Sequence, residues 1–174
     1  MKPAINLLVI PLIGIAFASG CSRPSSETVE LRHYAVNDMH DVVTRSGVEL
    51  DTDISSDGGG SLRITANKPT TVRLFETGEL DVENARLSYR AKLRSENMQG
   101  NVYLEMWCHF PGKGEFFSRA LDTAISGTVE WASQETPFFL KTGENPDNVK
   151  LNLVIEGSGT VWVDDIRLVQ AALR

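Results

Sequence analysis

The stretch ARLSYRAKLRSENMQGNVYLEMWCHF, residues 85–110, decides the fold because apolar and polar residues alternate along two long runs within it. Such alternation is typical of a β-strand with one buried face. The runs are separated by Ser95–Asn101, a segment rich in residues that tolerate turn geometry. The sequence therefore predicts a hairpin of two long strands with an apolar face in the core. The opposite face is mixed, and it is either a solvated surface or a binding surface.

The mixed face of the predicted hairpin combines aromatic, acidic and basic side chains. Successive side chains of a strand point to opposite faces, so every second residue of each run belongs to it. If the runs pair as a hairpin, the basic residues of the first run lie beside the aromatic residues of the second. The face contains Arg86, Arg90 and Lys92 from the first run and Tyr103, Glu105, Trp107 and His109 from the second.

The first twenty residues have the organisation of an export signal. Lys2 is their only charge, and the apolar run Ile5–Ala18 is interrupted by a proline and a glycine. A membrane-spanning helix needs about 20 apolar residues, so this run is too short and too interrupted to span a bilayer. A basic start, a short apolar centre and small residues behind it are typical of a signal peptide, here residues 1–20.

Cys21 directly follows the small residues Ala18-Ser19-Gly20, and this segment resembles the lipobox of bacterial lipoproteins. The resemblance implies that Cys21 is acylated, becomes the new N-terminus and anchors the protein to a membrane. Ser22 resembles the residue found in lipoproteins sorted to an outer membrane, so the expected location is the cell envelope, at the outer membrane in a Gram-negative host. A second interpretation stays open, because Ala16-Phe17-Ala18 is a cleavage signal that would release a soluble protein.

The rest of the chain has the length of one domain. Residues 21–28 are expected to form a polar tether, and residues 29–174 the domain itself. Removing residues 1–20 from the 174-residue chain leaves 154 residues, enough to bury a core. The formal net charge then changes from −6 to −7 because Lys2 is lost. This acidic balance argues against nucleic acid as a partner.

The segments on either side of residues 85–110 also read as strands separated by glycine, proline and asparagine turns. Many short strands at about 8–12-residue spacing are typical of a β-sandwich or barrel. No convincing amphipathic helix and no repeat accompany them. The expected strands are residues 29–34, 48–54, 61–67, 71–77, 115–123, 128–131, 135–142, 149–155 and 160–169.

Three segments resemble strands of carbohydrate-binding modules with a galactose-binding-like jelly roll. They are SDGGGSLRI (56–64), LDVENARLSYRAKLRS (80–95) and GSGTVWVDDIRL (157–168). The resemblance implies an all-β, antiparallel two-sheet jelly-roll sandwich with a non-catalytic role in binding a polysaccharide or glycan. The usual opening motif of these modules is absent, and HYAVNDMHD (33–41) stands in its place.

The chemistry of the mixed face suits a sugar, and its basic residues point to an acidic one. Sugars offer an apolar C–H face to an aromatic ring and many hydroxyls to polar groups around it. Trp107 would be the ring, and the polar groups would be Tyr103, Glu105, His109 and Arg90, with Lys150 and Asn152 outward on another strand. Packing of Trp107 and Tyr103 in the core is the competing interpretation. The alternative platforms are Trp131, one of Phe116 and Phe117, and one of Phe138 and Phe139.

A structural calcium ion is the second expectation. Jelly-roll modules of this type often bind calcium through an aspartate of the final strand, and Asp164 or Asp165 lies at the corresponding position. Asp51, Asp53 and Asp57 precede a glycine turn and could supply further oxygen ligands. Their spacing does not fit an EF-hand loop, and a solvated acidic loop is the alternative.

Two further functional classes stay open. Glu79-Leu80-Asp81-Val82-Glu83 resembles the E-x-D-x-E strand of retaining jelly-roll glycosidases, in which alternate acids point into one cleft. The residues that should follow this motif are not matched, so an enzyme is not expected. A lipid-anchored envelope subunit that contacts other proteins through the mixed face is the other class.

Cys108 alternates with apolar residues and is expected to be a buried free thiol.

Overall fold

One strand of 26 residues, β5, belongs to both sheets of the fold. The computed structural model describes residues 27–173. Its elements are β1 (Val29–Tyr34), β2 (Val48–Asp51), β3 (Ser61–Ala66), β4 (Thr70–Gly78), β5 (Ala85–Phe110), β6 (Gly114–Arg119), the 3-10 helix η1 (Leu121–Thr123), β7 (Ile125–Leu140), β8 (Asn148–Ile155) and β9 (Ser158–Ala172). All strand pairs are antiparallel, and the protein is the two-sheet jelly-roll sandwich that the sequence predicts.

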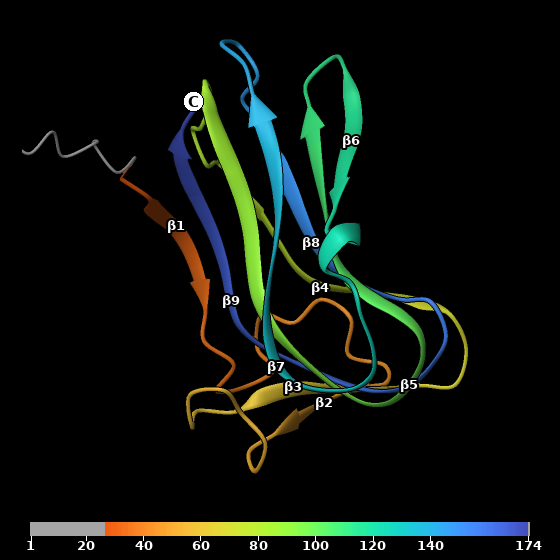
Figure 1. The fold of residues 1–174 in the computed structure, drawn as a ribbon. Helices are drawn as coiled ribbons and strands as arrows, with labels where there is room; N and C mark the ends of the chain where they lie inside the picture. The colour runs from red at the N-terminus through yellow and green to blue at the C-terminus, as the bar shows by residue number, and fades with distance from the viewer. Residues whose placement is uncertain (1–26, 174) are drawn as a thin grey trace, which may run out of the picture.

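The first half of β5 pairs with β7 on one side and β9 on the other. β9 in turn pairs with β3 and β1, and β3 pairs with β2, which completes the first sheet. The second half of β5 pairs with β6 and β8, and β8 pairs with β4, which completes the second sheet. Figure 1 shows β5 running the length of the molecule, turning at its lower end and returning toward β6.

The predicted hairpin is wrong, because the two halves of β5 pair with other strands instead of with each other. The segment between them bends the strand from one sheet into the other. Asn97 and Gly100 have φ values of 52° and 100°, and the pairing register shifts around Met98. A Cβ at Gly100 would lie 2.4 Å from the backbone oxygen of Glu156, so the bend needs glycine at this position.

The core was predicted correctly from the alternation. The apolar residues of both halves of β5 point into the sandwich and are buried, each with at most 7% of its surface exposed. Cys108 is among them, with no exposed surface, and burial raises the pKa of its thiol to about 12. These residues are Ala85, Leu87, Tyr89, Ala91, Leu93, Val102, Leu104, Met106, Cys108 and Phe110.

Several strand boundaries differ from the expectation; β2, for example, ends at Asp51 and not at residue 54. Residues 128–131 and 135–142 were expected to form separate strands, but they belong to the single strand β7. The strand stays continuous because Ser133 and Gln134 keep their pairing with Lys92 and Ala91 of β5. β6 ends at Arg119, earlier than expected, and the chain then enters η1.

The signal peptide, the lipidation site Cys21 and most of the tether lie outside the described residues, so these remain predictions. β1 begins at Val29, where the domain was expected to start. Between residues 27 and 173, no helix has the length and apolar character needed to cross a membrane.

Candidate functional site

An aromatic pair lies on the outward face of the second sheet. Trp107 of β5 is paired with Phe117 of β6 and Lys150 of β8. The rings of Trp107 and Phe117 have centroids 5.0 Å apart and planes inclined by 43°. Half of Phe117 is exposed, so the pair presents apolar surface to solvent. We call this surface the Trp107 face; it comprises Arg73, Trp107, Phe117, Arg119 and Lys150.

Glu105 lies beneath the aromatic pair and is only 4% exposed. Its Oε1 accepts hydrogen bonds from Trp107 Nε1 at 2.7 Å and from Asn152 Nδ2 at 3.0 Å. Its Oε2 accepts a hydrogen bond from Arg119 Nε at 2.7 Å. Burial alone would raise the pKa of Glu105, but these three hydrogen bonds and the charge of Arg119 lower it below the ordinary value. Glu105 is therefore an anion that orients the Trp107 ring.

Arg119 connects this buried carboxylate to the surface. Its guanidinium carbon lies 4.5 Å from the centre of the Phe117 ring, in a cation–π arrangement. Its side chain is 37% exposed, so its outer edge remains open to solvent. The role of Arg119 could not be predicted from the sequence, since only the β5–β6 register brings this residue opposite Glu105.

A hollow of about 270 Å³ lies beside Trp107 and is lined by Arg73, Trp107, Glu115 and Lys150. Lys150 Nζ donates a hydrogen bond to Glu115, and this bond lowers the pKa of the carboxyl group. Arg73 Nη1 lies 3.2 Å from Glu76. Every cation on the Trp107 face thus has a carboxylate partner, which makes the face polar but electrically balanced.

The other predicted residues of β5 have different positions. His109 lies at the end of the same face, with Nδ1 2.5 Å from Asp147 Oδ1. Tyr103 is 3% exposed, and its hydroxyl donates to Glu156 Oε1 at 2.9 Å. Burial, with Glu156 beside it, raises the pKa of Tyr103. Tyr103 therefore supports the face from below and does not present its ring to a ligand.

Arg90 does not lie beside Trp107, and this expectation was wrong. It projects from the first half of β5 on the outward face of the first sheet, where its Nε donates to Glu135 Oε2 at 2.8 Å. The error follows directly from the hairpin prediction, because cross-strand neighbours depend on which strands pair. Of the alternative platforms, Phe117 joins Trp107, while Phe116 points to the other side of β6 and packs against Phe110.

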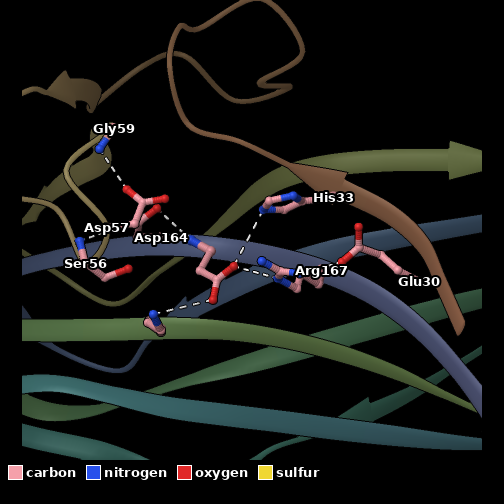
Figure 2. Close-up of polar contacts among 9 residues, drawn as sticks. Glu30, His33, Ser56, Asp57, Gly59, Asp164 and Arg167 are labelled. Atoms are coloured by element: carbon pink, nitrogen blue, oxygen red, sulfur yellow. Dashed lines mark hydrogen bonds and ion pairs between the residues drawn. The ribbon is translucent and has the colours of Figure 1, made fainter. Parts of the chain in front are cut away.

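Asp164, predicted as a calcium ligand, is 2% exposed and anchors a loop (Figure 2). Its Oδ2 accepts the backbone N–H of Ser56 at 2.7 Å, and its Oδ1 accepts that of Asp165 at 2.6 Å. Asp57 is likewise bonded to the backbone N–H of Gly59. Among residues 27–173, no three acidic, histidine or cysteine side chains are grouped so that they could hold a metal. The geometry gives the calcium site no support, and it remains a prediction.

The acids of the glycosidase-like motif are not on a strand. They lie in the loop between β4 and β5, where Glu79 and Asp81 have φ values of 52° and 47°. Glu83 accepts a hydrogen bond from the backbone N–H of Gly143, and Asp81 Oδ1 accepts one from Asn145 Nδ2 at 3.3 Å. The alternation that would aim three acids into one cleft is therefore absent from this loop.

Comparison with known proteins gives structural relatives only. No protein-family model matches the chain, and no curated protein sequence matches it. The CBM22-1 xylan-binding domain from Paenibacillus barcinonensis Xyn10C superposes with a TM-score of 0.61 and 10% identity, over 88% of this chain and 100% of that domain. A xylan-binding domain from CBM 22 gives 0.57 and 8%, over 86% and 97%. A family 16 carbohydrate-binding module gives 0.52 and 10%, over 70% and 84%. At such identities the similarity is one of fold.

Proposed function

We propose that the chain is a non-catalytic carbohydrate-binding module and that a neutral glycan binds to its Trp107 face. The observation that carries the proposal is the solvent-facing pair of Trp107 and Phe117 beside a polar hollow. The sandwich fold, which resembles that of carbohydrate-binding modules, supports this role. A fold alone does not determine function, so the argument depends on the chemistry of the face.

The aromatic pair would stack against the apolar face of a sugar ring. Tryptophan and tyrosine rings bury large apolar areas while their polar atoms keep hydrogen bonds, which suits an amphipathic ligand. Here the indole N–H is already engaged by Glu105, so the ring offers its apolar surface. Lys150, Glu115 and Arg73 surround the hollow and can exchange hydrogen bonds with sugar hydroxyls.

The charge balance of the face favours an uncharged ligand. Lys150 is paired with Glu115, Arg73 with Glu76 and Arg119 with Glu105. An anionic sugar would be attracted by three cations and repelled by three carboxylates. The net electrostatic contribution to its binding would therefore be small. Paired donors and acceptors can still bond to hydroxyls, which carry both a donor and an acceptor.

The test is affinity electrophoresis of the purified protein in gels containing neutral polysaccharides, xylan among them. Retardation by at least one neutral polysaccharide is expected, and it should disappear when the corresponding oligosaccharide is added in excess. Unchanged mobility in every gel would contradict the proposal.

The membrane anchor and the envelope location are part of the proposal and depend on the sequence alone. Acylated Cys21 would hold the domain at a membrane surface, and residues 22–28 would space it from the bilayer. A single-chain acyl anchor binds membranes only marginally, so stable attachment needs the multiple acylation typical of lipoproteins.

Protein interaction is the second candidate function, favoured by exposed apolar residues near β6 and β7. Phe116, Leu121 and Phe139 are 49%, 57% and 62% exposed. Exposed aromatic side chains such as Phe116 and Phe139 are of a type enriched in protein interfaces. Co-purification of an envelope protein that is lost in Phe139→Ser would favour this function, whereas glycan binding that is unaffected by Phe139→Ser would favour the first.

A further inference from the structure

A second hollow, of about 510 Å³, lies on the outward face of the first sheet. Its walls come from the first half of β5, from β7, from β9 and from Thr123 of η1, and it shares no lining residue with the hollow beside Trp107. We call it the arginine hollow; its charged walls are Arg90, Lys92, Glu135, Asp165 and Arg167. Its volume is within the range of small-molecule sites in proteins.

The two carboxylates of the arginine hollow are fully engaged by cations. Glu135 Oε2 accepts from Arg90 Nε at 2.8 Å, and Asp165 Oδ1 accepts from Arg167 Nε at 2.6 Å. Lys92 Nζ lies 3.5 Å from Asp165 Oδ2. Burial would raise the pKa values of both acids, but the hydrogen bonds and positive charges around them lower these values. Both carboxylates are therefore ionised and held in place.

The two arginines of the arginine hollow have N–H groups that bond to no acceptor in the described part of the chain. Arg90 uses its Nε, and within the described chain neither of its two Nη groups has a hydrogen-bond partner. Arg167 uses Nε for Asp165 and Nη1 for Glu30, and its Nη2 has no hydrogen-bond partner among residues 27–173 (Figure 2). The side chains of Arg90, Lys92 and Arg167 are 35%, 35% and 38% exposed, so solvent reaches them.

The surroundings keep the charge positive. Arg86 lies 3.9 Å from Glu135, and His33 lies 3.5 Å from Asp165. Among the described residues, three cations and two carboxylates line the hollow, and Arg86 and Glu30, which are paired with lining residues, add one charge of each sign. This local excess of one cation contrasts with the formal charge of −6 on the whole chain.

We propose that the arginine hollow binds the carboxylate of an acidic sugar, a uronate. One excess positive charge matches a singly charged carboxylate better than a dianionic phosphate. The free Nη groups of Arg90 provide the planar pair of donors that a carboxylate accepts. Ser133 and Thr123 line the same hollow and offer hydroxyls to the sugar ring. This site goes beyond the proposed function, because it involves none of the residues of the Trp107 face.

Isothermal titration of the purified protein with trigalacturonate tests the proposal. We expect saturable binding that weakens at least about tenfold in Arg90→Gln and in Arg167→Gln, because each removes a charge-assisted contact. Binding should also weaken with added salt. Arg63→Gln is the matched control, since Arg63 is an arginine of the same sheet that is ion-paired with Glu49, outside the hollow. It should leave the affinity unchanged.

Three further binding measurements test whether the carboxylate is recognised and whether the site is separate from the Trp107 face. The methyl-esterified trimer, which lacks the charge, should bind at least about tenfold more weakly, and inorganic phosphate should not compete at equal concentration. Trp107→Ala should leave trigalacturonate binding unchanged, so failure of the Trp107 face and failure of the hollow are distinguishable. Absence of trigalacturonate binding would overturn the proposal, as would equal affinity for the ester, effective competition by phosphate, or unchanged affinity in both arginine variants.

Discussion

Glu105 Oε1 lies 2.7 Å from Trp107 Nε1, and the two residues are two positions apart on the same strand. Side chains two apart on a strand share a face, so the carboxylate can hold the indole from directly beside it. Asn152 and Arg119 bind the same carboxylate from the two neighbouring strands. The orientation of the proposed sugar platform is thus set by a buried anion that three strands support.

Replacing Glu105 by Ala should lower the free energy of unfolding by about 2–4 kcal/mol, because it leaves the donors of Trp107, Asn152 and Arg119 without their acceptor. Urea denaturation followed by circular dichroism measures this loss. Glu115→Ala is the control, since Glu115 is an ion-paired glutamate on the exposed strand β6 and should change stability much less. An equal loss of unfolding free energy in the two variants would show that the network around Glu105 stabilises the protein no more than an exposed ion pair does.

Stability should fall with acidification in a way that depends on Glu105. Its pKa in the folded protein lies below the ordinary value of 4.5, so the folded state favours the ionised form. The stabilisation is therefore present above pH 4.5 and is lost as the pH falls through the lower, folded pKa. Denaturation from pH 6 to pH 3 should give a smaller fall for Glu105→Gln than for the wild type. Parallel curves would contradict this assignment.

Much of the architecture could be predicted from the alternation in residues 85–110, because burial on one face follows directly from a period of two. The pairing of strands could not. Asn97 and Gly100 have the conformations expected of a hairpin turn, yet they serve a bend that passes the strand to the other sheet. Local sequence specifies a left-handed backbone in both cases, and only long-range packing distinguishes the two.

Only the part of the candidate site that lies on a single strand could be predicted from the sequence. Trp107 and Glu105 share a face through local alternation alone, and the structure places them in contact. Phe117 and Arg119 become their neighbours only through the register between β5 and β6. Arg90 was assigned to the wrong surface for the same reason. Residues on one strand can be grouped from sequence, whereas neighbours from other strands require knowledge of the pairing.

The bend in β5 leads to a separate prediction about stability. Gly100→Ala should destabilise the protein by about 1–3 kcal/mol or more, since it combines a positive φ with a Cβ that collides with the backbone of Glu156. Thermal unfolding by calorimetry measures the effect. Gly112→Ala is the matched control, because Gly112 also has a positive φ but nothing lies within 4 Å of its added Cβ. A larger loss at Gly112 would contradict the role given to the bend.

Membrane attachment depends on Cys21 in our proposal. Cys21→Ala should move the protein from the membrane fraction to the soluble fraction of cells, because acylation needs the thiol. Immunoblotting of the two fractions measures the change. Cys108→Ala is the control, since Cys108 is buried in the core and should leave the partition unchanged. Equal membrane partitioning of the wild type and Cys21→Ala would exclude a lipid anchor at this residue.

The most direct measurement is the affinity of Trp107→Ala for the neutral polysaccharide that retards the wild-type protein, with Trp131→Ala of β7 as the matched tryptophan control. We predict that Trp107→Ala reduces affinity at least about tenfold while circular dichroism remains native, because the stacking surface for the sugar ring is removed. Trp131→Ala should bind as the wild type does, because Trp131 lies in the part of β7 that pairs with Leu93 and Ser95 in the first half of β5, not beside Trp107. Wild-type affinity in a folded Trp107→Ala variant would contradict the assignment of glycan binding to the Trp107 face.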